Sequence, residues 1–347
     1  MIDRRINHKD VRDLAVALLS ASGTDESEVG TIADILIWAD LVGRSTQGIW
    51  YLKTLLQRLR AGFIQSPCSP EFMQKTDGIA LVDGHNGFGR YVGHVAMSRA
   101  IELARRCGIG LVAVRNSSHF GAAAYYVHLA AQAGMIGFAF TNAQGRVAAH
   151  GGLRPIFGTN PIAFGAPWRD GNSVLIDFST SMMAGTVLRK GLESNEPIPE
   201  GVAIDEHGNP TTNPTEVFAM LPVGGAKGYC LSLLVEILTG VMTGSLMSFQ
   251  IPYIPEKTQR MTRIGHVFLV IDIATLLPLA EYHERMTMLV KAIKDSPLQP
   301  GVFEVLIPGE ARWQSYRKQI KEGILLDSKT IESLESLAAK QKIATPW

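Results

Sequence analysis

The residues best suited to chemistry lie in the segment Asn116-Ser-Ser-His-Phe-Gly121, where His119 stands among small polar side chains. The segment follows an apolar run, residues 110–114, with the composition of a buried strand. In α/β proteins, active-site groups often lie at the carboxyl ends of strands. Histidine exchanges a proton near neutral pH, as the interconversion of a carbonyl and an alcohol requires. These residues leave two interpretations of His119 open, an acid/base catalyst or a histidine that hydrogen-bonds its own turn.

Two further predicted strand ends also run from apolar residues into hydroxyl and amide groups. The first is 135–140, followed by Thr141 and Asn142, and the second is 174–178, followed by Ser179, Thr180 and Ser181. Asp177 lies inside the second strand. A buried carboxylate needs a partner, and an imidazole would suit, its pKa then being raised. The hydroxyls and amides after Asp177 could instead hold a cofactor phosphate, and an ordinary turn is a third interpretation.

A glycine-rich turn, Asp83-Gly-His-Asn-Gly-Phe-Gly89, joins a predicted strand at 79–82 to a predicted helix at 92–107. Glycines after a strand can bring the backbone close to a pyrophosphate. The spacing Gly87-x-Gly89-x-x-x-Gly93 contains one residue too many for that motif. The next strand also ends in Arg115-Asn116, without the acidic residue that would bind a ribose hydroxyl. We interpret the segment as a tight turn and not as a Rossmann fingerprint.

Lys227 follows Gly224-Gly-Ala and begins a long apolar segment, residues 228–247. A cation beside glycines suits a phosphate or carboxylate ligand, although a solvated surface lysine fits the sequence equally well. The apolar segment is of borderline length for a membrane span. It also carries Glu236 near its centre, where a charge would cost about 2.5–3.5 kcal/mol in a bilayer. We therefore expect a buried helix.

Two helices are predicted in the first forty residues. Apolar residues at helical spacing follow Asn7, which can cap the first helix, and Gly23 closes it. Asp25 and Glu28 have the spacing of a capping box for the second helix, which runs towards Leu41.

From about residue 76, short β-rich runs alternate with helical segments, which predicts an α/β layer structure. The predicted strands are 79–82, 110–114, 135–140, 162–164, 174–178 and 266–272, and the main helices between them are 92–107 and 122–133. The chain ends, 1–75 and about 281–347, are helix-rich and are expected to form one helical domain around an α/β domain at 76–280. The long polar stretch at 190–225 predicts a functional loop or lid.

Charge and composition exclude several classes of function. The 33 basic and 32 acidic residues give a net charge of +1 without a basic block, so no nucleic-acid partner is expected. Three widely spaced cysteines form neither a disulfide framework nor a C-x-x-C pair, and the first residues lack an apolar signal core, which suits the cytoplasm. The nine histidines show no H-E-x-x-H, so we expect no metal site.

Seven short motifs, each present once, are spread along nearly the whole chain. They are Val82-Asp-Gly-His-Asn-Gly-Phe-Gly89, Arg115-Asn-Ser-Ser-His-Phe-Gly121, Gly134-Met-Ile-Gly137, Gly158-Thr-Asn-Pro161, Glu196-Pro-Ile-Pro-Glu-Gly201, Gly225-Ala-Lys-Gly228 and Ile307-Pro-Gly-Glu310. Together they resemble the malate/L-lactate dehydrogenase family that is distinct from the classical lactate and malate dehydrogenases. Its members include ureidoglycolate and sulfolactate dehydrogenases, diketogulonate reductase and piperideine-carboxylate reductase.

The resemblance implies a non-Rossmann fold with a mixed sheet that binds NAD or NADP, usually as a homodimer. It gives His119 the role of acid/base, paired with Asp177, and places Thr141 and Asn142 near the reacting carbon. The residues it implies around the cofactor are Ile176, Asp177, Phe178, Ser179, Thr180, Ser181, Met182, Ala226, Lys227, Pro308, Gly309 and Glu310. The stretch 190–225 would also lie close to the cofactor.

One segment, Asp40-Leu-Val-Gly-Arg-Ser-Thr-Gln-Gly-Ile-Trp-Tyr51, departs from the family pattern. Gln47 stands where members commonly carry a second active-site histidine, and Tyr51 where an arginine often falls. Glutamine can hydrogen-bond a carbonyl, but it cannot deliver a proton near neutral pH. Arg44 could bind a substrate carboxylate instead, since its planar fork suits that task, or form a surface salt bridge.

Three functions follow as expectations. The first is hydride transfer between NAD(P)H and a small 2-oxo acid, with His119 handling the proton. The second is reduction of a C=N bond in a cyclic or N-substituted imino acid, which enters already protonated and so needs a second donor less. The third is a relative that has lost activity and only binds a ligand, as the changes at Gln47 and Tyr51 would allow.

Overall fold

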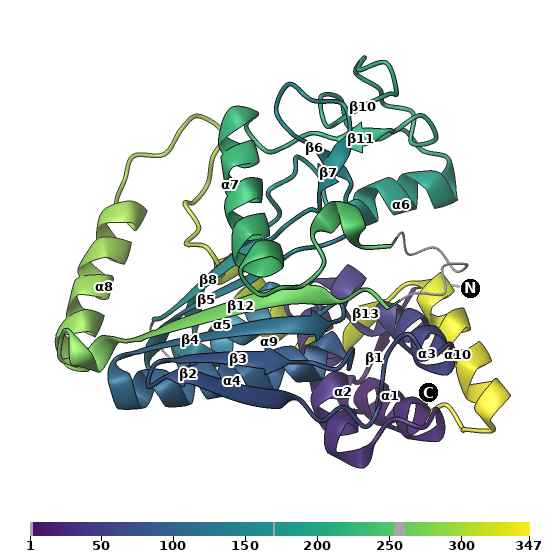
Figure 1. The fold of residues 1–347 in the computed structure, drawn as a ribbon, viewed down its shortest axis with the longest axis horizontal. Coiled ribbons are helices and arrows are strands. Elements are labelled where there is room, and N and C mark those ends of the chain that lie inside the picture. Colours follow the sequence, from purple (N-terminus) through teal and green to yellow (C-terminus); the bar gives the residue numbers. More distant parts are fainter. Residues whose placement is uncertain (1–2, 169–170, 253–260) are drawn as a thin grey trace.

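A seven-stranded mixed sheet forms the centre of the computed structural model, which describes residues 3–168, 171–252 and 261–347 (Figure 1). In order across the sheet, the strands are β2 (Glu71–Thr76), β3 (Ile79–Asp83), β4 (Ile109–Ser117), β12 (Ile264–Asp272), β5 (Met135–Thr141), β8 (Ile162–Pro167) and β9 (Ser173–Phe178). β3 and β4 pair in parallel, whereas β12 pairs antiparallel with both β4 and β5. The expected mixed α/β class is confirmed, and each predicted strand lies inside an observed one.

Helices α4 (Gly89–Cys107) and α5 (Ala123–Gln132) pack against one face of this sheet. Glycines in the strands make the close approach possible. A Cβ at Gly110 would lie 2.0 Å from the Ala100 carbonyl oxygen, and one at Gly165 would lie 2.4 Å from that of Val127. Because a close-packed interior has no room for such an atom, these positions require glycine to seat the helices.

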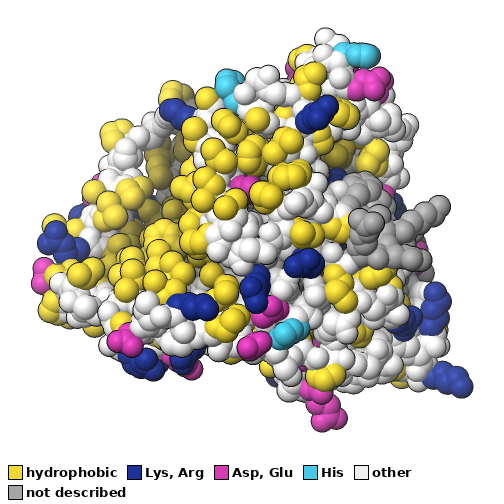
Figure 2. Space-filling model, viewed as in Figure 1, with side chains coloured by type: hydrophobic (Ala, Val, Ile, Leu, Met, Phe, Trp, Pro, Cys, Tyr) yellow, Lys and Arg dark blue, Asp and Glu magenta, His cyan; other side chains and the backbone are white. Residues whose placement is uncertain are grey.

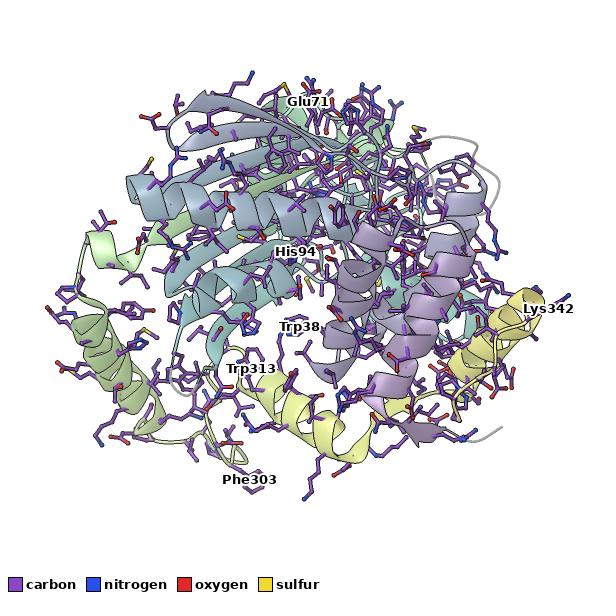
Figure 3. The ribbon with its side chains drawn as sticks, turned by 90° about the horizontal axis from the view of Figure 1, so that it is seen from below. Trp38, Glu71, His94, Phe303, Trp313 and Lys342 are labelled. Atoms are coloured by element: carbon purple, nitrogen blue, oxygen red, sulfur yellow. The ribbon has the colours of Figure 1, made fainter. Side chains whose placement is uncertain are left out.

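The two ends of the chain form one helical layer, as expected, which extends from the middle of Figure 1, where α9 lies, to its right. It contains α1 (His8–Ala21), α2 (Glu26–Leu41), α3 (Leu52–Arg60), α9 (Glu310–Glu322) and α10 (Ser328–Gln341). β1 (Arg4–Ile6) pairs antiparallel with β13 (Ile324–Leu326). Trp38 of α2 and Trp313 of α9 (Figure 3) both lie against the ring of His128, at 5.9 and 4.8 Å between centroids. The chain ends are thereby fixed to α5.

Helix α8 (Leu279–Lys294) falls outside this layer, although the sequence predicts residues from about 281 within it. It lies on the opposite side of the molecule (Figure 1), and none of its residues is buried. The boundaries of the two expected domains stay a prediction.

A small second sheet occupies the top of Figure 1. Its order is β10 (Ala203–Ile204), β11 (Ala219–Met220), β6 (Val147–Ala148) and β7 (Pro155–Phe157). The stretch 190–225 begins inside α6 (Gly185–Ser194) and supplies β10 and β11. Its apolar residues, including Ile198 and Val202, pack into a separate small core with Phe157 and Leu188. This stretch is therefore partly ordered by its own strands, and is not the irregular loop that its composition predicts.

The predicted helix starts are correct, but one predicted capping box is wrong. Asn7 and Asp25 accept hydrogen bonds from the backbone N–H groups of Lys9 and Ser27 and so cap α1 and α2. Glu28 does not reach back to Asp25. Its buried carboxylate accepts hydrogen bonds from the hydroxyl of Ser66, at 2.7 Å, and from the N–H of Cys68. A buried carboxylate needs these donors more than an exposed helix end needs a second cap.

The long apolar segment forms α7 (Ala226–Glu236) and a π-helical turn, η3 (Ile237–Val241). Glu236 is buried, where its carboxylate accepts from the N–H of Ser248 at 2.6 Å and from the amide of Asn160 at 2.8 Å. The expectation of a fully buried helix is wrong, because one side stays exposed, with Val241 at 60%. Within the described ranges, no helix is long and apolar enough to cross a membrane.

Candidate active site

His119 lies just after β4, where the glycine-rich turn supports its backbone. The hydroxyl of Ser118 donates to the Gly87 carbonyl oxygen at 2.9 Å and accepts from the N–H of Gly89 at 2.8 Å. A Cβ at Gly89 would lie 1.9 Å from the Ser118 carbonyl oxygen, so no other residue fits there without moving the His119 segment. The turn is tight, as expected, with positive φ at His85. Its glycines serve packing behind the histidine.

The imidazole of His119 is half-buried at the edge of a small cavity. Its ring stacks on Tyr51, with 5.1 Å between centroids, and its Nδ1 has no hydrogen-bond partner among the described residues. The cavity is lined by Tyr51, Leu55, Arg58, Ile64, Ser118, His119 and Thr262. This nitrogen is buried, so a ligand could bond to it only after the groups that cover it move.

At pH 7, the cations that act on His119 are the guanidinium groups of Arg90, Arg58 and Arg189. Burial, followed by the guanidinium of Arg90, by His266 and by Arg58 and Arg189, lowers the pKa of His119 to about 3. The histidine is therefore neutral at pH 7 in the free protein and can accept a proton. An anionic molecule beside it would be attracted by the same cations.

Asp177, the predicted partner of His119, makes its contacts elsewhere. Its Oδ2 lies 3.4 Å from Nη1 of Arg312 and 3.4 Å from the backbone nitrogen of Ala124 at the start of α5. Nη2 of Arg312 also donates to the Asp177 carbonyl oxygen at 3.2 Å. The predicted pairing with His119 is wrong for this structure, as is the rise in its pKa. The desolvated guanidinium of Arg312 takes the carboxylate instead.

Thr141 and Asn142 at the end of β5 are buried and bonded to β12. The hydroxyl of Thr141 lies 2.8 Å from Nδ1 of His266 and donates to the Gly265 carbonyl oxygen at 3.1 Å. The amide of Asn142 donates to the Leu246 carbonyl oxygen at 2.7 Å, and its oxygen accepts from the N–H of Gly265 at 3.1 Å. Both side chains thus fix the strand ends next to His266. Their predicted place near the reacting carbon stays a prediction.

His266 is a site residue that the sequence pattern missed. Its ring stacks on Phe120, directly after His119, with 4.7 Å between centroids, and burial lowers its pKa to about 3. The sequence did contain a signal for it, because His266 is a polar residue inside the apolar run 266–272.

Gln47 and Tyr51 meet a second missed residue, Arg90 from the first turn of α4. Nη2 of Arg90 donates to the backbone oxygen of Gln47 at 3.1 Å, and its guanidinium carbon lies 5.0 Å from the centre of the Tyr51 ring. Arg44 lies elsewhere. It is exposed and lines a different cleft of about 450 Å³, together with Arg312 and the turn at 308–309.

The predicted cofactor residues come from three stretches that meet around β9. The N–H of Met182 donates to the Leu221 carbonyl oxygen at 2.8 Å, and Ser181 forms a β-bridge with Pro222, which brings the loop after β9 to the start of α7. Ala226 and Lys227 are exposed in the first turn of that helix.

The third stretch reaches β9 through its backbone. The N–H of Leu175 donates to the Pro308 carbonyl oxygen at 3.0 Å. Glu310 begins α9, and its carboxylate accepts from the N–H of Ile307 at 2.7 Å and from Lys294 at 2.5 Å. The side chain of Glu310 is thereby held in its own turn.

Within the loop after β9, the individual positions differ in exposure. Phe178 and Met182 are exposed, while Thr180 and Ser181 are buried. The hydroxyl of Thr180 donates to the Asn160 carbonyl oxygen at 3.1 Å and accepts from that of Ser232 at 2.8 Å. The hydroxyls of Ser179 and Ser181 donate to backbone oxygens of the same loop, at 3.2 and 2.7 Å. In this structure, the hydroxyls of the loop hold its shape.

Comparison with known proteins gives a consistent result over the whole chain. Residues 6–335 match a family model described as malate/L-lactate dehydrogenase. The malate/(S)-sulfolactate dehydrogenase of Methanothermus fervidus is 35% identical over 344 residues, 99% of each chain. The (2R)-3-sulfolactate dehydrogenase (NADP(+)) of Chromohalobacter salexigens is 34% identical over 342 residues, 98% of this chain and 100% of the other. Malate dehydrogenase from Entamoeba histolytica superposes with a TM-score of 0.94 at 30% identity, covering 99% of this chain and 100% of that one.

Proposed function

The chain belongs to the malate/L-lactate dehydrogenase family, and we propose that His119 accepts and donates the proton in its reaction. The protein is an oxidoreductase that uses NAD or NADP and interconverts a small 2-oxo acid and a 2-hydroxy acid. One observation carries the proposal for His119. The neutral imidazole lines a small cavity together with Arg58, and its Nδ1 has no partner among the described residues.

In the oxidation direction, the neutral imidazole of His119 accepts the proton of the substrate hydroxyl. The hydride leaves the carbon that bears this hydroxyl with its electron pair, and a carbonyl forms. Bound NAD(P) supplies the hydride acceptor in this direction and the hydride donor in the reverse one. In reduction, the protonated His119 returns its proton to the carbonyl oxygen. Asp177 does not contact His119. Its ion pair with Arg312 instead holds β9 against α9.

The cofactor is proposed to lie along the end of β9. Residues 176–182, Ala226 with Lys227, and the turn at 308–310 would hold it. The donor chemistry fits, because an exposed lysine in the first turn of α7 adds its charge to the free N–H groups of a helix N-terminus, which favour phosphate. The shape of the loop after β9 is set by its own hydrogen bonds, so its backbone and exposed side chains are the groups offered to the cofactor.

A homodimer is proposed from the exposed apolar surface. Figure 2 shows hydrophobic side chains gathered over α7 and the neighbouring face of the sheet. Further large apolar side chains are exposed elsewhere, Met288 of α8 at 71% and Phe303 in the segment after it at 94%. Large contiguous apolar patches mark interaction sites on soluble folds, and a second copy of the chain would cover this one. The cysteine usage supports a cytoplasmic location.

The function is tested by following oxidation of NADH and NADPH with a panel of 2-oxo acids. We expect turnover by the native protein and a loss of about 100-fold or more in His119→Ala. His94→Ala is the matched control, since His94 is a partly buried histidine on α4 that contacts Tyr125 (Figure 3). Equal turnover in the native protein and His119→Ala would contradict the role of His119.

The same panel tests the two alternative functions, reduction of a C=N bond and ligand binding without catalysis. Cyclic ketimines are added to the oxo acids. Turnover of ketimines alone would favour reduction of a C=N bond. Cofactor binding by calorimetry without turnover of any compound would indicate a ligand-binding relative.

A further inference from the structure

Among the described residues, Arg90 is the largest fully buried side chain, with 0% of its surface exposed. Its Nη2 donates to the backbone oxygen of Gln47, but Nε and Nη1 have no hydrogen-bond partner in the described part of the chain. Arginine stays protonated in proteins, so the charge cannot be removed by loss of a proton. Burying a charge without its partner is strongly unfavourable.

The acidic groups near the site are engaged with other residues. Asp177 pairs with Arg312, and Asp83 pairs with Arg115 at 3.0 Å. Asp40 accepts from the backbone nitrogen of Ile49 at 2.7 Å. Among the described residues, none of the ion pairs involves Arg90. The guanidinium is therefore held in place without a carboxylate of its own.

The ring of Tyr51 and the turn at Gly121 link the guanidinium of Arg90 to His119. The ring of Tyr51 contacts both groups, at 5.0 Å from the guanidinium carbon and 5.1 Å from the centre of the imidazole. Gly121, two residues after His119, has a φ of 85°, and a Cβ there would lie 3.2 Å from Nε of Arg90. Because Gly121 has no side chain, the guanidinium of Arg90 fits against the turn that follows His119.

We propose that Arg90 binds the carboxylate of the 2-oxo or 2-hydroxy acid substrate next to His119, and that Gln47 and Tyr51 move to admit it. A carboxylate offers the acceptors that Nε and Nη1 lack. In such an acid it is attached directly to the carbon that exchanges hydride, so a cation that shares the Tyr51 ring with His119 orients that carbon once Tyr51 moves. Since Arg90 has no exposed surface, the residues that cover it must shift first. This inference rests on the proposed function.

Substrate binding at Arg90 would also raise the pKa of His119. Arg90 is the leading charge among those that hold the pKa of His119 low. A bound carboxylate offsets that charge, so the pKa of His119 rises when substrate is present. The histidine can then keep the proton that it receives during oxidation.

The decisive experiment compares Arg90→Gln with Arg99→Gln, a matched control on the same helix whose guanidinium bonds to Glu102 and Gln74 near the surface. Oxalate is titrated by calorimetry into each protein with saturating NADH or NADPH. We expect oxalate to bind the native protein and the control, and to bind Arg90→Gln at least about 100-fold more weakly, which corresponds to about 2.7 kcal/mol. Equal binding by all three proteins would overturn the proposal.

A second readout separates this role from a structural one. If the charge of Arg90 has no partner until a ligand binds, replacing Arg90 by Met removes an unpaired buried charge. The melting temperature of the free protein should then rise by about 2 °C or more. If Arg90 mainly supports the fold, the melting temperature falls, and the proposal is wrong. Both measurements are independent of turnover, so they remain decisive even if no 2-oxo acid is reduced.

Discussion

Asp40 at the end of α2 allows a sharp test, because its carboxyl group is buried and holds the turn that carries Gln47 and Tyr51. It is 3% exposed, and its Oδ2 accepts from the backbone nitrogen of Ile49 at 2.7 Å. Burial raises the pKa of Asp40 from 3.8 to about 8. The folded protein therefore keeps this proton at pH values where the unfolded chain has lost it.

The sign of the effect follows from this difference. The contribution of Asp40 to stability is full below about pH 4 and is lost progressively as the pH rises towards 8. At about 1.36 kcal/mol for each pH unit, the loss between pH 5 and pH 8 is about 4 kcal/mol. Asn cannot ionise and still offers an oxygen to Ile49. Asp40→Asn should therefore gain about 4 kcal/mol relative to the native protein over this interval.

The assay is urea unfolding of both proteins at pH 5, 6, 7 and 8. Asp13→Asn, at an exposed position in α1, is the control for the loss of a carboxylate. The difference in unfolding free energy between Asp40→Asn and the native protein should grow with pH, while that of the control stays nearly constant. A difference independent of pH would refute the assignment of a protonated Asp40.

Three further predictions concern the same region. A Cβ at Gly48 would lie 2.1 Å from Oδ1 of Asp40, so Gly48→Ala should lower the unfolding free energy by about 1–3 kcal/mol in urea titrations. Because the pKa of His119 is about 3 in the free protein, kcat/KM for oxidation should not fall between pH 8 and pH 6, and an acid limb near pH 6.5 would contradict this. Asp177→Asn should lower stability by about 1.5–3 kcal/mol, and adding Arg312→Met should recover part of the loss in thermal unfolding.

Local patterns predicted most of the elements because they depend on neighbouring residues. The strand 135–140 alternates buried and half-buried positions, and its hydroxyl and amide end is where the pattern places it. The tight turn before α4 follows from glycine spacing. These features need no knowledge of distant parts of the chain.

Pairings over long sequence distances could not be predicted in the same way. Asp177 and Arg312 are 135 residues apart, and no motif links them. The sequence offers both His119 and Arg312 as partners for the half-buried carboxylate of Asp177, and only the fold selects the arginine. The inward turn of Glu28 to Ser66 and Cys68 has the same origin.

Arg90 shows why a charged residue can escape pattern analysis even when it lies in a recognised segment. Its position in the first turn of α4 is typical of a solvated helix start, and only the packing of Tyr51 and Gly121 buries it. The low pKa of His119 and the unpaired nitrogens of Arg90 have the same cause. Arginine side chains are buried near the histidine, and among the described residues no acidic side chain pairs with Arg90. The unpaired buried charge of Arg90 makes the free protein less stable than it could be at neutral pH, and the lowered pKa of His119 does so only below about pH 6.5. An anion bound between the acid/base and the guanidinium would relieve both, which ties the stability of the site to the presence of its substrate.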